Sequence, residues 1–151
     1  MRFLKAAVLE YDDINVGALY SFQKKIFKEQ VIQFADITGD YNPLHIDPVF
    51  GKKSLFNKNI VHGMFIGSLF STLVGMHCPG EKCLYVSQTL KFKKPIFYDD
   101  QVIVQGTVIS KNDSVQLVTI KTEIIKEDNV VISGEAIIRV LKFLFFFKKY
   151  Y

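Results

Sequence analysis

The stretch 59–80, NIVHGMFIGSLFSTLVGMHCPG, is the longest run of the chain without a charged residue. Its 22 residues are enough for a helix to cross a membrane. However, two histidines, three internal glycines and a terminal Pro79-Gly80 argue against a membrane span, so we expect no membrane insertion. A helix that is apolar on all sides belongs in a protein core. We therefore predict a fully buried helix of about four turns, in which Gly67, Ser68 and Ser71 let a sheet approach the axis closely.

The hydrophobic period changes after this run. Apolar and polar residues then alternate with the period of a β-strand in four segments: 84–92, 102–108, 118–124 and 134–140. Polar turns at 111–114 and 127–129 separate the last three. Consecutive strands joined by short turns form an antiparallel meander. We expect an α+β fold in which one central helix packs against one curved antiparallel sheet.

The segment before the run supplies one more strand and one more helix. Residues 19–27 carry aromatic and apolar residues between polar ones, which predicts a strand. Residues 28–38 show the i, i+3, i+4 spacing of a helix, and Gly39 is placed to terminate it. Asp47-Pro48 suits the N-cap and first position of a further short helix.

Asp40 and His45 stand five residues apart in DYNPLHID, residues 40–47. Pro43 disfavours helical geometry at Asn42, so we predict a bend that can point both side chains at one small volume. An imidazole titrates near neutral pH, and a carboxylate can orient it or act with it on a bound water. The pair therefore indicates acid–base chemistry. Taken alone, such an Asp and His more often serve as a helix cap and a turn residue bonded to backbone.

Length and composition bound the remaining possibilities. At 151 residues the chain is predicted to form a single domain, residues 1–151. Fourteen Phe, seven Tyr and no Trp suit a well-filled core or an apolar ligand tunnel. The net charge of +4 is modest and the lysines are scattered, so we expect no nucleic-acid partner.

The two cysteines, Cys78 and Cys83, lie close to His77 in one loop. A zinc site needs about four ligands, and no second Cys/His cluster follows, so we predict no metal. Two reduced thiols are favoured over a local disulfide. The first residues are interrupted early by acidic side chains and do not resemble a secretory signal. We expect a cytoplasmic protein.

The last residues, 141–151, form an aromatic and basic tail, LKFLFFFKKYY. Such a tail can be the last strand running on into a frayed end, or a patch that touches a membrane surface or a partner. We favour the first interpretation because the stretch is short and has no clear amphipathic period.

Three segments, FADITGDYNPLHID (34–47), IVHGM (60–64) and KFKKPI (91–96), together resemble the MaoC-like (R)-specific enoyl-CoA hydratases, a branch of the hotdog-fold superfamily. The first looks like the hydratase signature of that family, the second like the opening of its central helix, and the third like its strand-and-proline segment. The resemblance covers roughly residues 19–140. One departure is Asp99-Asp100, where the family usually has Gly-Asp; it affects a turn rather than the chemistry.

The resemblance implies a hotdog fold, in which an antiparallel sheet wraps around a central helix, and a homodimer with an acyl-CoA tunnel at the subunit interface. It implies the reversible syn addition of water to a trans-2-enoyl-CoA, giving an (R)-3-hydroxyacyl-CoA. On this sequence Asp40 and His45 would hold the water and exchange protons, and the N–H of Gly63 would donate to the thioester oxygen. No cofactor is implied, because acyl-CoA is the substrate.

Asn42, Ser71 and Met64 are the residues that the resemblance and the pattern together place in substrate binding. Asn42 is expected to hold the catalytic loop by hydrogen bonds, while Ser71 and Met64 are expected to line the pocket. His62 is expected to be structural, as a helix cap or in an interface hydrogen bond.

Three other functions are open at this point. A 3-hydroxyacyl-[acyl-carrier-protein] dehydratase uses the same chemistry on a different carrier. A thioesterase needs a carboxylate aimed at the thioester carbonyl rather than an Asp/His pair. A non-catalytic acyl-CoA binder on the same fold could lose Asp40 or His45 without penalty, and both are present.

Overall fold

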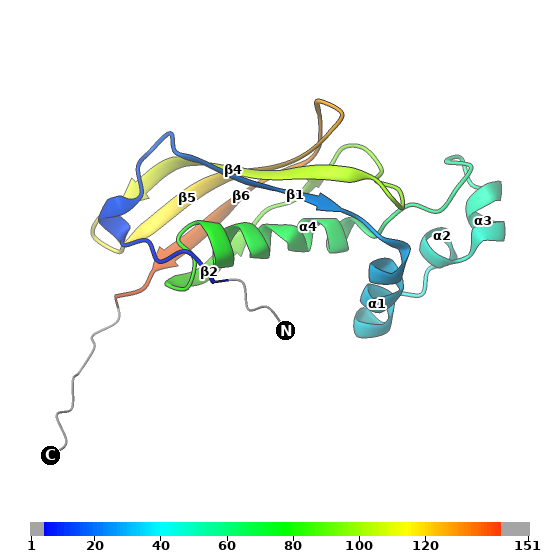
Figure 1. Cartoon of the computed structure of the whole chain (residues 1–151), viewed down its shortest axis with the longest axis horizontal. Helices are drawn as coiled ribbons and strands as arrows, with labels where there is room; N and C mark the ends of the chain where they lie inside the picture. Colours follow the sequence, from blue (N-terminus) through cyan, green and yellow to red (C-terminus); the bar gives the residue numbers. More distant parts are fainter. Residues whose placement is uncertain (1–4, 143–151) are drawn as a thin grey trace, which may run out of the picture.

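The computed structural model describes residues 5–142, and a six-stranded antiparallel sheet forms most of it. The strand order is β1-β4-β5-β6-β2, with β3 also paired to β6. The strands are β1 (Leu19–Lys25), β2 (Cys83–Gln88), β3 (Lys91–Phe92), β4 (Gln101–Asn112), β5 (Leu117–Lys126) and β6 (Asn129–Val140). Helix α4 (Gly63–Thr72) lies along one face of this sheet, which confirms the predicted α+β hotdog architecture (Figure 1).

Three short helices lie beyond one end of the sheet, namely α1 (Lys28–Thr38), α2 (Pro43–Ile46) and α3 (Pro48–Lys53) (Figure 1). The predicted bounds of α1 are confirmed, and its C-cap Gly39 has the left-handed conformation, with φ 76°. Asp47 caps α3 and Pro48 opens it, as predicted. A 3₁₀ turn, Tyr11–Asp13, precedes β1.

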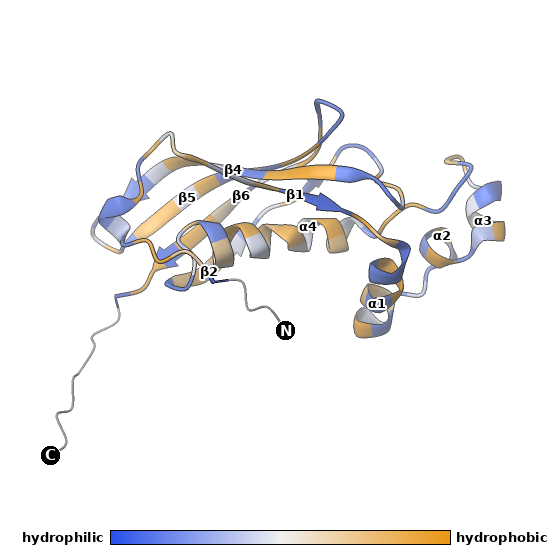
Figure 2. Cartoon of the chain, in the orientation of Figure 1, coloured by the Kyte–Doolittle hydropathy of each residue, from blue (hydrophilic) through white to orange (hydrophobic). Residues whose placement is uncertain are grey.

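The meander of β4, β5 and β6 confirms the last three predicted strands and extends each of them. Alternate side chains of these strands are buried, and they face α4 to form much of the core: Val102, Val104, Val108, Val118, Ile120, Ile124, Ala136 and Ile138. Figure 2 shows apolar residues recurring along these strands and hydrophilic residues at the turn between β5 and β6. The two-residue hydrophobic period in the sequence therefore correctly predicted which side chains of these strands are buried.

The predicted strand 84–92 is not continuous, and it does not adjoin the next strand in sequence. It is split into β2 and β3, and each of these two strands pairs with β6 rather than with β4. Between them Thr89 bonds to Glu135, accepting at its hydroxyl and donating from its N–H. A Cβ at Gly134 would stand 1.8 Å from the Thr89 carbonyl oxygen, so only glycine permits this close passage.

The central helix is shorter and less buried than predicted. The α-helical part covers ten residues and continues into a single π-helical turn, Leu73–His77. Ser68 and Ser71 are exposed, so the prediction of a fully buried helix is wrong for the chain described. The sheet covers only one face of the helix. Gly67 is buried, as predicted, and a Cβ there would meet Leu90 at 2.8 Å. Gly106 of β4 also permits the close approach, because a Cβ there would meet Leu73 at 2.7 Å.

Two further predictions concern membranes and thiols. Within residues 5–142, no helix combines the length and apolar character needed to span a membrane. Cys78 and Cys83 are both free thiols, as predicted. Of the predicted aromatic and basic tail, residues 143–151 lie outside the described part of the chain.

Candidate active site

The loop that follows α1 fixes Asp40. Gly39 turns the chain out of the helix, and the N–H of Asp40 then donates to the Thr38 hydroxyl at 3.3 Å. The Asp40 carboxylate accepts from the N–H of Asn42 at 3.2 Å, which closes a small Asx turn. The carboxylate is therefore held in the loop while half of its side-chain surface, 51%, stays exposed.

His45 lies on the single turn of α2 rather than on a plain bend. Pro43 keeps Asn42 out of helical geometry, as predicted, with φ −53° and ψ 125°. Pro43 also occupies the first helical position, where it is tolerated, and the Asn42 side chain accepts from the N–H of Leu44 at 2.9 Å. The helix N-cap thus sets the direction from which His45 enters the site.

Two hydrogen bonds anchor His45 to other parts of the chain, one to Ile60 and one to Tyr98. Its Nδ1 lies 2.9 Å from the carbonyl oxygen of Ile60, which can only accept, so Nδ1 carries the proton in this bond. The hydroxyl of Tyr98 donates to the carbonyl of His45. In the neutral ring Nε2 is then left with its lone pair, the state that a proton acceptor needs.

Asn59 ties α2 and α3 to the start of the central helix. Its side chain is buried, and Nδ2 donates to the carbonyls of Pro43 (3.1 Å), Leu44 (2.9 Å) and Asp47 (2.9 Å). Sequence reasoning missed this residue. The sequence offered one signal: Asn59 is an amide at the start of a long apolar run, where its side chain has no evident role within the neighbouring sequence.

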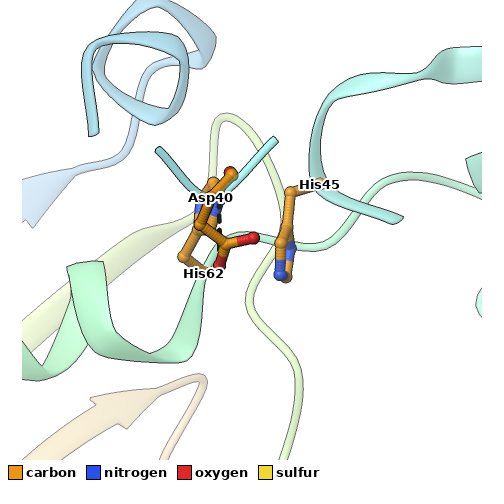
Figure 3. A group of neighbouring side chains, drawn as sticks. All are labelled: Asp40, His45 and His62. Carbon is orange, nitrogen blue, oxygen red and sulfur yellow. Dashed lines mark hydrogen bonds and ion pairs between the residues drawn. The ribbon is translucent and has the colours of Figure 1, made fainter. Parts of the chain in front are cut away.

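His62 contacts both predicted catalytic residues, and the three side chains lie together at one place (Figure 3). Its Nε2 is 2.9 Å from the carbonyl oxygen of Asp40 and 3.7 Å from the carboxylate of the same residue. Its ring centroid is 3.9 Å from that of His45. Although His62 stands at the N-cap of α4, its side chain makes no capping hydrogen bond, so the expected capping role is not seen.

The carboxylate of Asp40 and the imidazoles of His45 and His62 offer ligand atoms that all lie within 4.8 Å of one another. Two hydrogen bonds of ordinary length can therefore reach one water from Asp40 and His45. The same set could also hold a metal ion, since two imidazoles and a carboxylate are suitable ligands. That the protein uses no metal stays a prediction.

A cavity of about 600 Å³ opens at these side chains. Its walls are mainly apolar, and the polar groups gather at one place, as in sites for small organic ligands. The lining residues are Asp40, His45, Phe56, Ile60, Val61, His62, Gly63, Met64, Ile66, Phe92, Lys93, Lys94, Pro95, Ile96 and Ile132. Two exposed lysines, Lys93 and Lys94, supply positive charge to this lining.

Gly63 is the first residue of α4 and lines the cavity. Within the described chain its N–H has no hydrogen-bond acceptor, and the positive end of the helix dipole lies at the same point. The ring of Phe92 packs so closely that a Cβ here would stand 2.9 Å from it. Because Gly63 has no side chain and its N–H is unpaired among the described residues, this N–H can donate to an oxygen in the cavity.

The three predicted substrate-binding residues are placed differently. Met64 is 60% exposed and lines the cavity. Asn42 is absent from the lining and caps α2 instead, so its contacts support the loop rather than a ligand. Ser71 is exposed further along α4 and is also absent from the lining.

The chain matches the MaoC like domain family over residues 13–129. It is 35% identical over 127 residues to an (R)-specific enoyl-CoA hydratase of Aeromonas caviae, a match that covers 83% of this chain and 95% of the relative. It is 33% identical to a mitochondrial 3-hydroxyacyl-[acyl-carrier-protein] dehydratase of Arabidopsis thaliana, covering 82% of this chain and 75% of the relative.

Solved structures resemble the described fold over a similar extent. The (R)-hydratase of Aeromonas caviae superimposes with a TM-score of 0.82 and 34% identity, covering 85% of this chain and 98% of the other. An R-hydratase of Pseudomonas aeruginosa, solved without ligand, gives a TM-score of 0.84 and 29% identity, covering 88% and 86%. The fold and the sequence thus point to the same group of proteins.

Proposed function

Because the chain belongs to the MaoC like domain family, we propose that it is an (R)-specific enoyl-CoA hydratase. It adds water reversibly across a trans-2-enoyl-CoA and gives an (R)-3-hydroxyacyl-CoA. It is therefore a hydro-lyase, and acyl-CoA is its substrate. The same catalyst accelerates the reverse dehydration, since a catalyst lowers the barrier in both directions.

One observation carries the proposal: Asp40, His45 and the N-terminus of α4 meet at one polar corner of a mainly apolar cavity. Water is a weak nucleophile and the α-proton of a thioester is a weak acid. Hydration therefore needs a proton acceptor, a proton donor and a group that stabilises negative charge on the thioester oxygen. An apolar cavity in addition suits the acyl chain.

In the proposed reaction, Asp40 and His45 hold one water beside the double bond. The pair removes a proton from the water while its oxygen bonds to the β-carbon, and the pair returns a proton to the α-carbon on the same face. The electrons of the double bond pass through the enolate of the thioester. The N–H of Gly63 donates to that oxygen, where the helix dipole also favours negative charge.

We propose that the protein acts as a homodimer joined edge to edge through β2. This edge strand exposes Leu84 and Val86, by 49% and 55%, whereas β1 at the other edge exposes mainly polar side chains. An unpaired apolar edge is a liability that a second copy would cover. Sedimentation should give twice the mass of one chain for the wild type, and the mass of a single chain for Val86→Lys. A monomeric wild type would refute the dimer.

A second function on the same site is dehydration of 3-hydroxyacyl groups on acyl carrier protein. The similarity to the Arabidopsis dehydratase favours this alternative, although that relative is longer than the match.

We further propose a cytoplasmic location, which the two free thiols support because reducing compartments keep cysteines unpaired.

The test follows the loss of enoyl-thioester absorbance with crotonyl-CoA, with longer enoyl-CoAs and with a crotonyl carrier protein. We expect rapid hydration by the wild type, and losses of about 10²- to 10⁴-fold in kcat for Asp40→Asn and for His45→Gln. Unchanged thermal unfolding of the variants is the control. Turnover of the carrier-protein substrate alone would favour the second function, and tight acyl-CoA binding without turnover would leave only a binding protein.

A further inference from the structure

We propose that His62 is a positioning residue that holds Asp40 and His45 in their working geometry. This inference rests on the proposed hydratase function. His62 has only two apolar residues, Ile60 and Val61, directly before it, and its side chain is only 2% exposed, as for an ordinary core residue. Its contacts, however, are with the two side chains proposed to act on water.

The first contact fixes the backbone of Asp40. The Asp40 carbonyl oxygen is an acceptor only, so the Nε2 of His62, at 2.9 Å, must carry the proton in this bond. The bond bridges residues 22 positions apart in the sequence. It therefore attaches the exposed loop after α1 to the buried start of α4, and the carboxylate of Asp40 is oriented from a fixed backbone.

The second contact limits the ring of His45. The two imidazole centroids are 3.9 Å apart with an angle of 33° between the planes, so His62 forms one wall against which the His45 ring rests. The bond from Nδ1 of His45 to Ile60 sets the tilt of that ring from the other side. His62 is moreover the chain neighbour of Gly63, so one residue connects all three parts of the proposed site.

The hydrogen bond of the His62 side chain also predicts its tautomer. With the proton on Nε2, the neutral ring leaves a lone pair on Nδ1, and this atom is buried with no hydrogen-bond partner among the described residues. His45 has the opposite arrangement, with its proton on Nδ1. The site therefore contains two imidazoles in opposite tautomers.

Substitutions at position 62 separate the hydrogen bond from the bulk of the ring. The amide nitrogen of Gln reaches about as far from the backbone as Nε2 of His, whereas that of Asn reaches only as far as Nδ1. We expect His62→Gln to stay within about fivefold of the wild-type kcat. His62→Asn and His62→Ala should lose about 10- to 100-fold in kcat, with KM changed by less than about threefold, because small displacements of reacting groups are costly.

His77 supplies a matched control, because the chain has three histidines and this one lies outside the site. It is half-buried and stacks on Phe22, with centroids 5.1 Å apart and planes 3° apart. His77→Gln should therefore hydrate crotonyl-CoA at the wild-type rate. Thermal unfolding of every variant shows whether a loss of activity comes from a loss of fold.

A second measurement needs no activity. Long-range ¹H–¹⁵N spectra of the wild type resolve the imidazole nitrogens, and the three His→Gln variants assign them. We expect the Nε2–H tautomer for His62 and the Nδ1–H tautomer for His45. An Nδ1–H tautomer at His62, or a kcat of His62→Gln as low as that of a well-folded His62→Ala, would overturn the inference. A wild type that hydrates no enoyl thioester would instead overturn the proposed function.

Discussion

At the scale of single residues, backbone carbonyls orient the side chains that we propose act on water. The carbonyl of Ile60 holds His45, and the carbonyl of Asp40 is held by His62. Such bonds fix the tautomer of each ring, which a contact between two titrating side chains could not do alone. The proposed reaction needs one further single-residue feature, a donor for the thioester oxygen, and we assign this role to the N–H of Gly63.

Gly63 allows its N–H to be removed with little change in the backbone. Proline is tolerated at the first position of a helix, and His62 before it already has the extended geometry that proline requires, with φ −54° and ψ 125°. We expect Gly63→Pro to lower kcat by about 10²- to 10³-fold relative to Gly63→Ala, because an oxyanion donor is lost.

Gly63→Ala is the matched control for this prediction. Its Cβ meets the same Phe92 ring, 2.9 Å away, but its N–H is retained. The Phe92 side chain is 53% exposed and can move aside. Steady-state hydration of crotonyl-CoA provides the comparison, with circular dichroism to verify the helix. Equal kcat values for the two variants would show that the Gly63 N–H is not the donor.

At the scale of elements, one amide holds the short helices α2 and α3 against the rest of the chain. Neither helix is long enough to be stable by itself. Asn59 satisfies three carbonyls around their junction, and Gly51 of α3 packs so tightly there that a Cβ would stand 2.6 Å from the backbone nitrogen of Asn59. The position of His45 thus depends on a residue outside its own helix.

We expect Asn59→Ala to lower the free energy of unfolding by about 1–3 kcal/mol, because the hydrogen bonds of a buried amide to three carbonyls are lost. Asn59→Asp should lose more, since a carboxylate has no donor and would face carbonyl oxygens. Asp47→Ala removes only the exposed cap of α3 and should cost about 1 kcal/mol. Urea unfolding measures all three, and an Asn59→Asp variant as stable as the wild type would contradict the role of this amide.

At the scale of the whole molecule, burial of neutral acids couples stability to alkaline pH. Burial is the first cause that raises the pKa of the Cys78 and Cys83 thiols from 9.0 to about 11. It likewise raises the pKa of the Tyr20 and Tyr85 hydroxyls from 10.0 to about 12. The unfolded chain therefore releases these protons at lower pH than the folded chain does.

The sign of the effect follows from this order of proton release. Stability from these groups is fully present below pH 9, decreases as the unfolded chain ionises, and is lost by about pH 12. We expect the urea concentration at the midpoint of unfolding to decrease as the pH is raised from about 8.5 to about 10.5. Tyr85→Phe should show a smaller fall because one of the buried acids is gone. A midpoint independent of pH over this range would contradict the prediction.

Features that depend on neighbouring residues could be predicted from the amino-acid sequence. The bounds of α1, the termination at Gly39 and the cap at Asp47 follow from helix propensity and end chemistry within a few positions. The strands of the meander follow from an apolar period of two. The family also followed from sequence, because the signature around Asp40 and His45 is long and its order specific.

Features that depend on segments far apart in the chain became visible only in the folded structure. The pairing of β2 with β6, the exposed face of α4 and the three carbonyls satisfied by Asn59 each require a partner that no local pattern names. The same holds for His62, whose bond to Asp40 crosses 22 positions. Sequence periodicity reports which side of an element is apolar, whereas the folded chain decides which group stands opposite each polar atom.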